Sequence, residues 1–100
     1  MGFGTTVFPH PTGIVVHGGV SLGERVTIYQ NVTIASHPRD NRAASIGDDA
    51  VLCAGCVIVG PVKIGKGSII GANSVVTSDI PAGVTAVGMP ARAIPSKRFT

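Results

Sequence analysis

The strongest constraint on this chain is a period of six residues that runs from Ile46 to Ile80. Cut into sixes, the stretch reads IGDDAV, LCAGCV, IVGPVK, IGKGSI, IGANSV and VTSDI. The first place of each six holds an aliphatic residue, and the fifth holds a small or modest one, except Ile80. Glycine often fills the second place, where it tolerates a tight turn. A short period kept over successive units predicts a repeat architecture.

Each six is expected to form one short strand and one corner. The aliphatic first residue would point into a narrow prism, and the fifth would fit inside where the wall turns. Three sixes would close one triangular coil, and coils would stack at about 4.8 Å, the spacing of paired strands. The sequence therefore predicts an all-β, single-stranded parallel β-helix of about four coils with one protruding loop.

The same phase extends toward the N-terminus and meets a histidine there. First places fall at Ile34, Ile28, Leu22, Val16 and His10. His10 breaks the rule, because a polar ring stands where an aliphatic side chain is expected. One interpretation is a wetted residue at the end of the prism. The other, which we favour, is a functional residue.

The polar segment between Ile34 and Ile46 is expected to leave the helix as a loop. We predict a single domain over residues 1–100, with repeats at about 4–34 and 46–81, a loop at 35–45, and a closing segment and tail at 82–100. An excursion from a regular solenoid often carries function, and this one carries His37. A solvated tether is the alternative.

Composition argues against several classes of protein. The formal net charge is +3, with 13% charged residues and 4% aromatic residues. This charge is too mild, and too little interleaved with aromatics, to indicate a nucleic-acid partner. No apolar run approaches the length that spans a membrane, and no signal peptide opens the chain. We therefore expect a cytoplasmic protein that does not associate with membranes.

Cys53 and Cys56 form a CxxC motif, which can indicate redox chemistry or half of a zinc site. Cys56 is a fifth-place residue that should point inward, whereas Cys53 is a second-place residue that should point outward. Two thiols on opposite sides of one wall cannot readily bridge, so we expect both to be reduced. Because no second cysteine pair exists, no metal site is predicted.

Two long stretches resemble a known family. HPTGIVVHGGVSLGERVTIYQNVTI, and after the loop IGDDAVLCAGCVIVGPVKIGKGSIIGANSVVTSDIPAGVTAVGMPAR, are similar to the C-terminal catalytic half of serine acetyltransferases. The repeats and the GMPAR ending are shared across the hexapeptide-repeat acyltransferase superfamily, whereas HPTGIVV and IYQNVTI are narrower. The resemblance implies a left-handed helix, a homotrimer with sites between subunits, and acetyl-CoA-dependent O-acetyl transfer to a small hydroxyl acceptor.

The resemblance also implies catalytic residues. His10 matches the family's catalytic histidine and would act as the general base toward the acceptor hydroxyl. His37 is the nearest candidate for a second histidine that the family carries in its loop. The family usually has Asp directly before the catalytic histidine, where this chain has Pro9. That departure bears mainly on the acceptor.

Acetyl-CoA in the family lies in a groove between neighbouring helices, against small residues. Ser36, Ala54 and Ala72 occupy the corresponding positions here. We add Arg92 and Lys97 for the phosphates, on charge alone.

Three alternatives for function follow from this resemblance. Serine is the first acceptor to consider, and a sugar hydroxyl or a xenobiotic is the second. The third belongs to another class: a non-catalytic trimeric β-helix scaffold with weak or no CoA binding.

Overall fold

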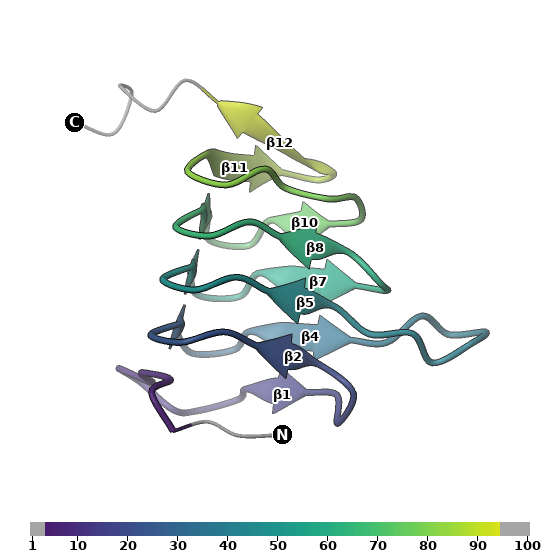
Figure 1. Cartoon of the computed structure of the whole chain (residues 1–100), viewed down its shortest axis with the longest axis horizontal. Helices are drawn as coiled ribbons and strands as arrows, with labels where there is room; N and C mark the ends of the chain where they lie inside the picture. The colour runs from purple at the N-terminus through teal and green to yellow at the C-terminus, as the bar shows by residue number, and fades with distance from the viewer. Residues whose placement is uncertain (1–3, 95–100) are drawn as a thin grey trace.

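Short strands wind into a triangular prism of stacked coils in the computed structural model, which describes residues 4–94 (Figure 1). Wall A contains β3 (Thr27–Ile28), β6 (Val51–Leu52), β9 (Ile69–Ile70), β11 (Thr85–Gly88) and β12 (Ala91–Ile94). Wall B contains β1 (Val15–Val16), β4 (Thr33–Ala35), β7 (Val57–Val59) and β10 (Val75–Val76). Wall C contains β2 (Ser21–Leu22), β5 (Ser45–Ile46) and β8 (Lys63–Ile64). Neighbouring strands in each wall pair in parallel, except β11 and β12, which form an antiparallel hairpin at the C-terminal end.

The chain passes from wall A to wall B, to wall C and back to wall A in each coil. We name each corner by the two walls that it joins. Corner AB comprises residues 9–13, 29–31, 53–55 and 71–73; corner BC comprises 17–19, 36–44, 60–61 and 77–79; corner CA comprises 23–25, 47–49, 65–67 and 81–83. The loop that leaves at corner BC, between β4 and β5, protrudes from the prism (Figure 1).

First-place and fifth-place side chains fill the interior, as the period predicts. The buried first-place residues are Ile28, Ile34, Ile46, Leu52, Ile58, Ile64, Ile70 and Val76. The buried fifth-place residues are Val20, Val26, Val32, Ala44, Ala50, Cys56, Val62, Ser68 and Ser74. Ser68 donates its hydroxyl hydrogen to the carbonyl of Gly65, and Ser74 Oγ accepts the N–H of Gly88 at 3.0 Å. Both interior hydroxyls are therefore satisfied. The all-β parallel helix with one protruding loop is confirmed.

The period of six breaks at the N-terminal end. Val7 bridges Thr27 in parallel, and the carbonyl of Val7 accepts the N–H of Ile28 at 2.9 Å. Phe8 is therefore in register with Ile28, and it packs partly buried against the core. The period of six instead predicts that His10, two positions later, is in register with Ile28.

His10 is exposed, so the prediction that it fills an interior place is wrong. Pro9 and Pro11 flank it, and neither has an N–H group that a wall strand could donate to the coil above. The segment therefore turns outside the wall and adds two residues to corner AB. The correction leaves His10 on the outer surface.

A second break occurs at Ile80, which the period places fifth. Ile80 instead bridges Ile64, a first-place residue, so this unit is two residues short. Asp79 compensates for the missing backbone, because its Oδ1 accepts the N–H of Lys63 at 2.9 Å. In the coils below, the equivalent N–H groups donate to fifth-place carbonyls, as that of Ser45 does to Val62 at 3.0 Å.

Gly65 tests how closely the coils approach at corner CA. A Cβ atom on Gly65 would lie 2.3 Å from the backbone nitrogen of Ala82. Since backbone must move to admit it, we expect Gly65→Ala to lower the free energy of unfolding by about 2 kcal/mol or more. Gly18→Ala is the matched control, because a Cβ there meets nothing within 4 Å; it should change stability by less than about 0.5 kcal/mol. Urea unfolding of both variants measures the difference, and equal stabilities would contradict this packing.

Candidate active site

Third-place residues of successive coils lie directly above one another at corner AB. The N–H of Asn31 donates to the carbonyl of Thr12 at 2.9 Å, that of Gly55 to Gln30 at 3.0 Å, and that of Asn73 to Ala54 at 3.0 Å. These hydrogen bonds stack Thr12, Gln30, Ala54 and Ala72 in that order. We call Gln30, Ala54 and Ala72 the AB column.

His10 lies at the foot of this column. The carbonyl of His10 accepts the N–H of Thr12 at 2.8 Å, which closes a tight turn between two prolines. The imidazole faces the ring of Tyr29 in the next coil, with ring centroids 6.5 Å apart and ring planes 34° apart. A prolyl turn and an aromatic neighbour therefore hold the imidazole at the surface, where a ligand can reach it.

Arg92 lies at the opposite end of the same corner. Strand β11 continues past wall A over corner AB, since the N–H of Gly88 reaches Ser74 and a Cβ on Gly71 would meet Val87 Cγ1 at 2.6 Å. Arg92 is the antiparallel partner of Val87 in β12, and it is exposed. A permanent cation thus stands beyond Ala72, at the end of the column away from His10.

The structure brings four of the predicted site residues to one corner and leaves the others elsewhere. His10, Ala54, Ala72 and Arg92 follow corner AB. Ser36 and His37 lie at corner BC, because they come after β4 at the far end of wall B. Within one chain Ser36 therefore lies apart from Ala54 and Ala72, and the predicted groove between neighbouring helices would need the Ser36 of another subunit. Lys97 lies outside the described residues.

The loop holds His37 through its Nδ1 atom. Nδ1 accepts the N–H of Arg39 at 3.2 Å and lies 3.5 Å from Asp40 Oδ1. Arg42 Nε donates to Asp40 Oδ2 at 2.8 Å, and the N–H of His37 donates to the carbonyl of Arg42 at 2.9 Å. Hydrogen bonds from Arg42, the backbone N–H above all, lower the pKa of Asp40. In a neutral His37 that accepts at Nδ1, the proton is on Nε2.

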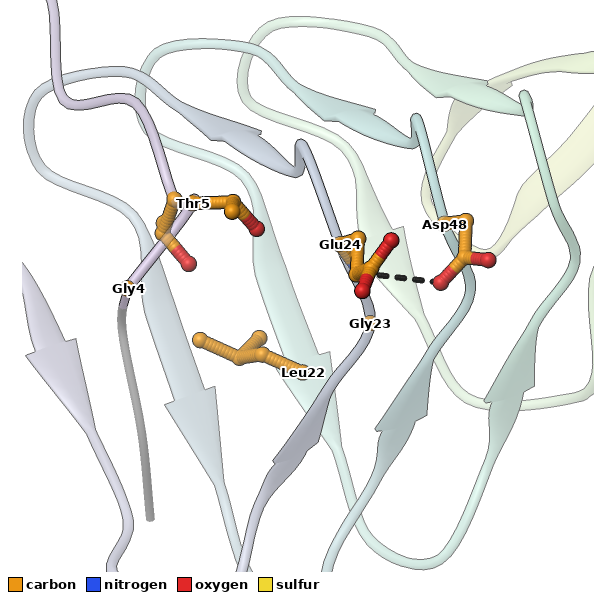
Figure 2. Close-up of a pocket in the computed structure, with 7 residues that line it drawn as sticks. Gly4, Thr5, Leu22, Gly23, Glu24 and Asp48 are labelled. Atoms are coloured by element: carbon orange, nitrogen blue, oxygen red, sulfur yellow. Dashed lines mark hydrogen bonds between the residues drawn. The ribbon is translucent and has the colours of Figure 1, made fainter.

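Two depressions on the surface of residues 4–94 bear on the choice of site, and neither is lined by His10. One, of about 700 Å³, lies at corner BC between His37 and residues 59–62 and 77–79. The other, of about 550 Å³, lies at corner CA beside Gly4, Thr5 and Leu22 (Figure 2). There the N–H of Glu24 donates to Asp48 Oδ1 at 2.8 Å. That second depression offers carboxylates but no histidine, so we do not assign the chemistry to it.

Tyr29 and Gln30 are residues of this site that the sequence analysis did not single out. Both lie in the IYQNVTI motif. The period already places Tyr29 second and Gln30 third in their unit, the same places as Cys53 and Ala54 one coil above. That phase was the signal that could have found them.

The two thiols differ in environment, as the period predicts. Cys56 is buried in the interior, whereas Cys53 is half-buried at corner AB, next to Ala54, and both are free. Burial raises the pKa of Cys56 to about 12 and also raises the pKa of Cys53.

Alkylation distinguishes these thiols. At pH 8, a thiol with a pKa of about 12 has almost no thiolate, and Cys56 is also shielded from reagent. We expect iodoacetamide to modify Cys53 slowly and Cys56 not at all in the folded protein, with both modified after unfolding in guanidinium. Peptide mass spectrometry reads the result, and equal rates at the two positions would contradict it.

Residues 4–94 contain no group of three or more His, Cys, Asp or Glu side chains that could hold a metal ion. That same part of the chain has no helix with the length and apolarity needed to cross a membrane.

The sequence and the fold match known proteins. Residues 43–78 match the family described as bacterial transferase hexapeptide (six repeats). The serine acetyltransferase of Mycobacterium tuberculosis is 38% identical over 94 residues, which are 91% of this chain and 41% of that protein. A soybean serine acetyltransferase complexed with serine superposes with a TM-score of 0.85 at 41% identity, over 89% of this chain and 37% of that one. A serine acetyltransferase complex with CoA gives a TM-score of 0.83 at 37% identity, over 89% and 37%.

The repeats at residues 43–78 are therefore similar to those of bacterial transferase hexapeptides, and the fold is the left-handed parallel β-helix of the serine acetyltransferase structures that it matches. More narrowly, the chain is similar to serine acetyltransferases, as the HPTGIVV and IYQNVTI motifs predict. It spans about two fifths of the length of these relatives.

Proposed function

We propose that this chain forms the acyl-transfer site of an acetyl-CoA-dependent O-acetyltransferase, with corner AB as the donor site. The observation that carries the proposal is the alignment along one corner of an accessible imidazole, small side chains and a cation. The similar proteins support it, since they are serine acetyltransferases. A serine acetyltransferase was solved as a complex with CoA.

The residues of corner AB fit acetyl-CoA in a defined direction. Ala54 and Ala72 are half-buried and exposed respectively, and their methyl groups leave room for a pantetheine arm along the corner. Arg92 at the far end would pair with phosphate oxygens. The thioester would then lie at the foot of the column, beside His10.

In the proposed reaction His10 is the general base. An imidazole nitrogen takes the proton of the acceptor hydroxyl as its oxygen attacks the thioester carbonyl. The carbon–sulfur bond then breaks, and the CoA thiolate leaves and takes up a proton. Most of the rate would come from holding both reactants in line, which the prolyl turn around His10 assists.

A homotrimer would complete the site. The outward residues of walls A and B include Val15, 59% exposed, and Ile69, 38% exposed, whereas wall C presents Ser21, Ser45 and Lys63. A closed ring of identical subunits needs two different surfaces on each, and the two apolar walls supply them. A neighbour's loop, with its Ser36 and His37, would then face corner AB.

The proposed acceptor is a small hydroxyl compound, with serine as the first candidate on the names of the relatives. We also propose a cytoplasmic location, since free thiols suit a reducing compartment.

Replacing His10 tests the base. His10→Gln keeps size and polarity but cannot take up a proton, so CoA release from acetyl-CoA in the presence of L-serine should fall by about 10²- to 10⁴-fold. Lys66→Ala is the control, because Lys66 is exposed at corner CA, away from both corners that the proposed site uses. That variant should keep full activity.

Full activity in His10→Gln would overturn the assignment of the base. If the wild-type protein released no CoA with L-serine, with sugar hydroxyls or with hydroxylated antibiotics, while still binding CoA, the scaffold alternative would replace the enzyme.

The assembly has its own test. Light scattering should give about three times the chain mass of 10.1 kDa. Val15→Lys places a charge on wall B and should shift the mass toward one chain, whereas Ser21→Lys, on polar wall C, should not. A monomeric wild-type protein at micromolar concentration would contradict the trimer.

A further inference from the structure

Gln30 carries a buried hydrogen-bond acceptor that nothing in the described chain satisfies. Its Oε1 atom is removed from solvent and has no hydrogen-bond partner among residues 4–94. The atom is the sole buried side-chain nitrogen or oxygen of that range left in this state. Because a buried acceptor without a donor is destabilising, a donor from outside the chain is the expected remedy.

The position of Gln30 narrows down that donor. Gln30 occupies the third place at corner AB, where the next two coils have Ala54 and Ala72. Its own backbone follows the pattern of the column, since its carbonyl accepts the N–H of Gly55 at 3.0 Å. Gln30 thus differs from Ala54 and Ala72 only in its long side chain, and it lies one coil above the segment that carries His10.

We infer that Gln30, whose Oε1 atom has no partner to lose, turns this atom outward at corner AB, where it accepts the N–H of the pantetheine amide nearest the thioester. The inference rests on the proposed function. Two methylene groups separate the thioester sulfur from that amide nitrogen. The amide nitrogen therefore lies about 4 Å from the sulfur when the arm is extended along the corner, close to the coil spacing of about 4.8 Å. With the thioester at His10, this amide reaches the level of Gln30, and the remaining arm passes Ala54 and Ala72.

This arrangement explains why a glutamine stands where alanine suffices elsewhere. Beside Ala54 and Ala72, the arm needs only space. Beside Gln30, the buried amide N–H of the ligand needs an acceptor, and the acceptor of Gln30 needs a donor. Each unpaired group satisfies the other, and the hydrogen bond fixes how far the arm slides along the corner. Gln30 is a positioning residue for the thioester.

Binding of two ligands to Gln30→Met tests the inference. Methionine has nearly the same volume but no acceptor oxygen. Calorimetry on the full chain should show CoA binding about five-fold weaker, the loss of one neutral hydrogen bond. Adenosine 3′,5′-bisphosphate lacks the pantetheine arm, so its affinity should stay unchanged.

The melting temperature of the ligand-free variant separates this role from a structural one, since loss of a structural contact would lower it. Removing an unsatisfied buried acceptor should leave the melting temperature of the ligand-free protein unchanged or raised. Gln30→Ala is the second variant, and it should fold because alanine occupies the same place at Ala54 and Ala72. It should reproduce the selective loss of CoA affinity.

Several results would overturn the inference. Equal CoA affinity in wild type and both variants would remove Gln30 from the site while leaving the proposed function intact. Equal weakening for CoA and for the bisphosphate, or a fall in melting temperature with both variants, would show a structural or intersubunit role. If the wild-type protein bound neither ligand, the proposed function itself would fail.

Discussion

Backbone hydrogen bonds between coils are the interaction on which the rest of this molecule depends. Each wall strand pairs with the strand one coil away. At corners AB and CA a fourth-place N–H donates to a third-place carbonyl below, as that of Gly55 does to Gln30. Because of these bonds, residues that hold the same place in successive coils stack directly above one another. Side chains at fixed intervals in the sequence are therefore aligned along one corner, and corner AB is an example of such an alignment.

The period predicts the fold well because the place of a residue in its unit of six decides whether its side chain lies inside. Ser68 and Ser74 are inside although serine is not a typical core residue, since both stand in fifth places. The prediction fails where a unit gains or loses two residues. At His10 two prolines turn the chain outside the wall, and at Ile80 the carboxylate of Asp79 replaces missing backbone. The period of six does not indicate such local changes in the path of the backbone.

The candidate site could be predicted from the sequence only where its residues follow the period of six. Ala54 and Ala72 share a place in their units, so their alignment could be foreseen. The arrival of Arg92 at that corner could not, because β11 and β12 abandon the period and fold back as an antiparallel hairpin. Ser36 and His37 reach the opposite end of wall B, a separation that only the order of walls reveals.

The two ends of the prism are covered unequally. The hairpin of β11 and β12 lies across the C-terminal coil, whereas Ile14, Val16 and Leu22 in the first described coil are only half-buried. Local opening requires the least work where the least apolar surface is buried, so fraying should start at the coil that carries His10. A ligand bridging from that coil to Arg92 would act as a strap along the stack. Binding of such a ligand would then slow amide hydrogen exchange in the N-terminal coil, far from Arg92.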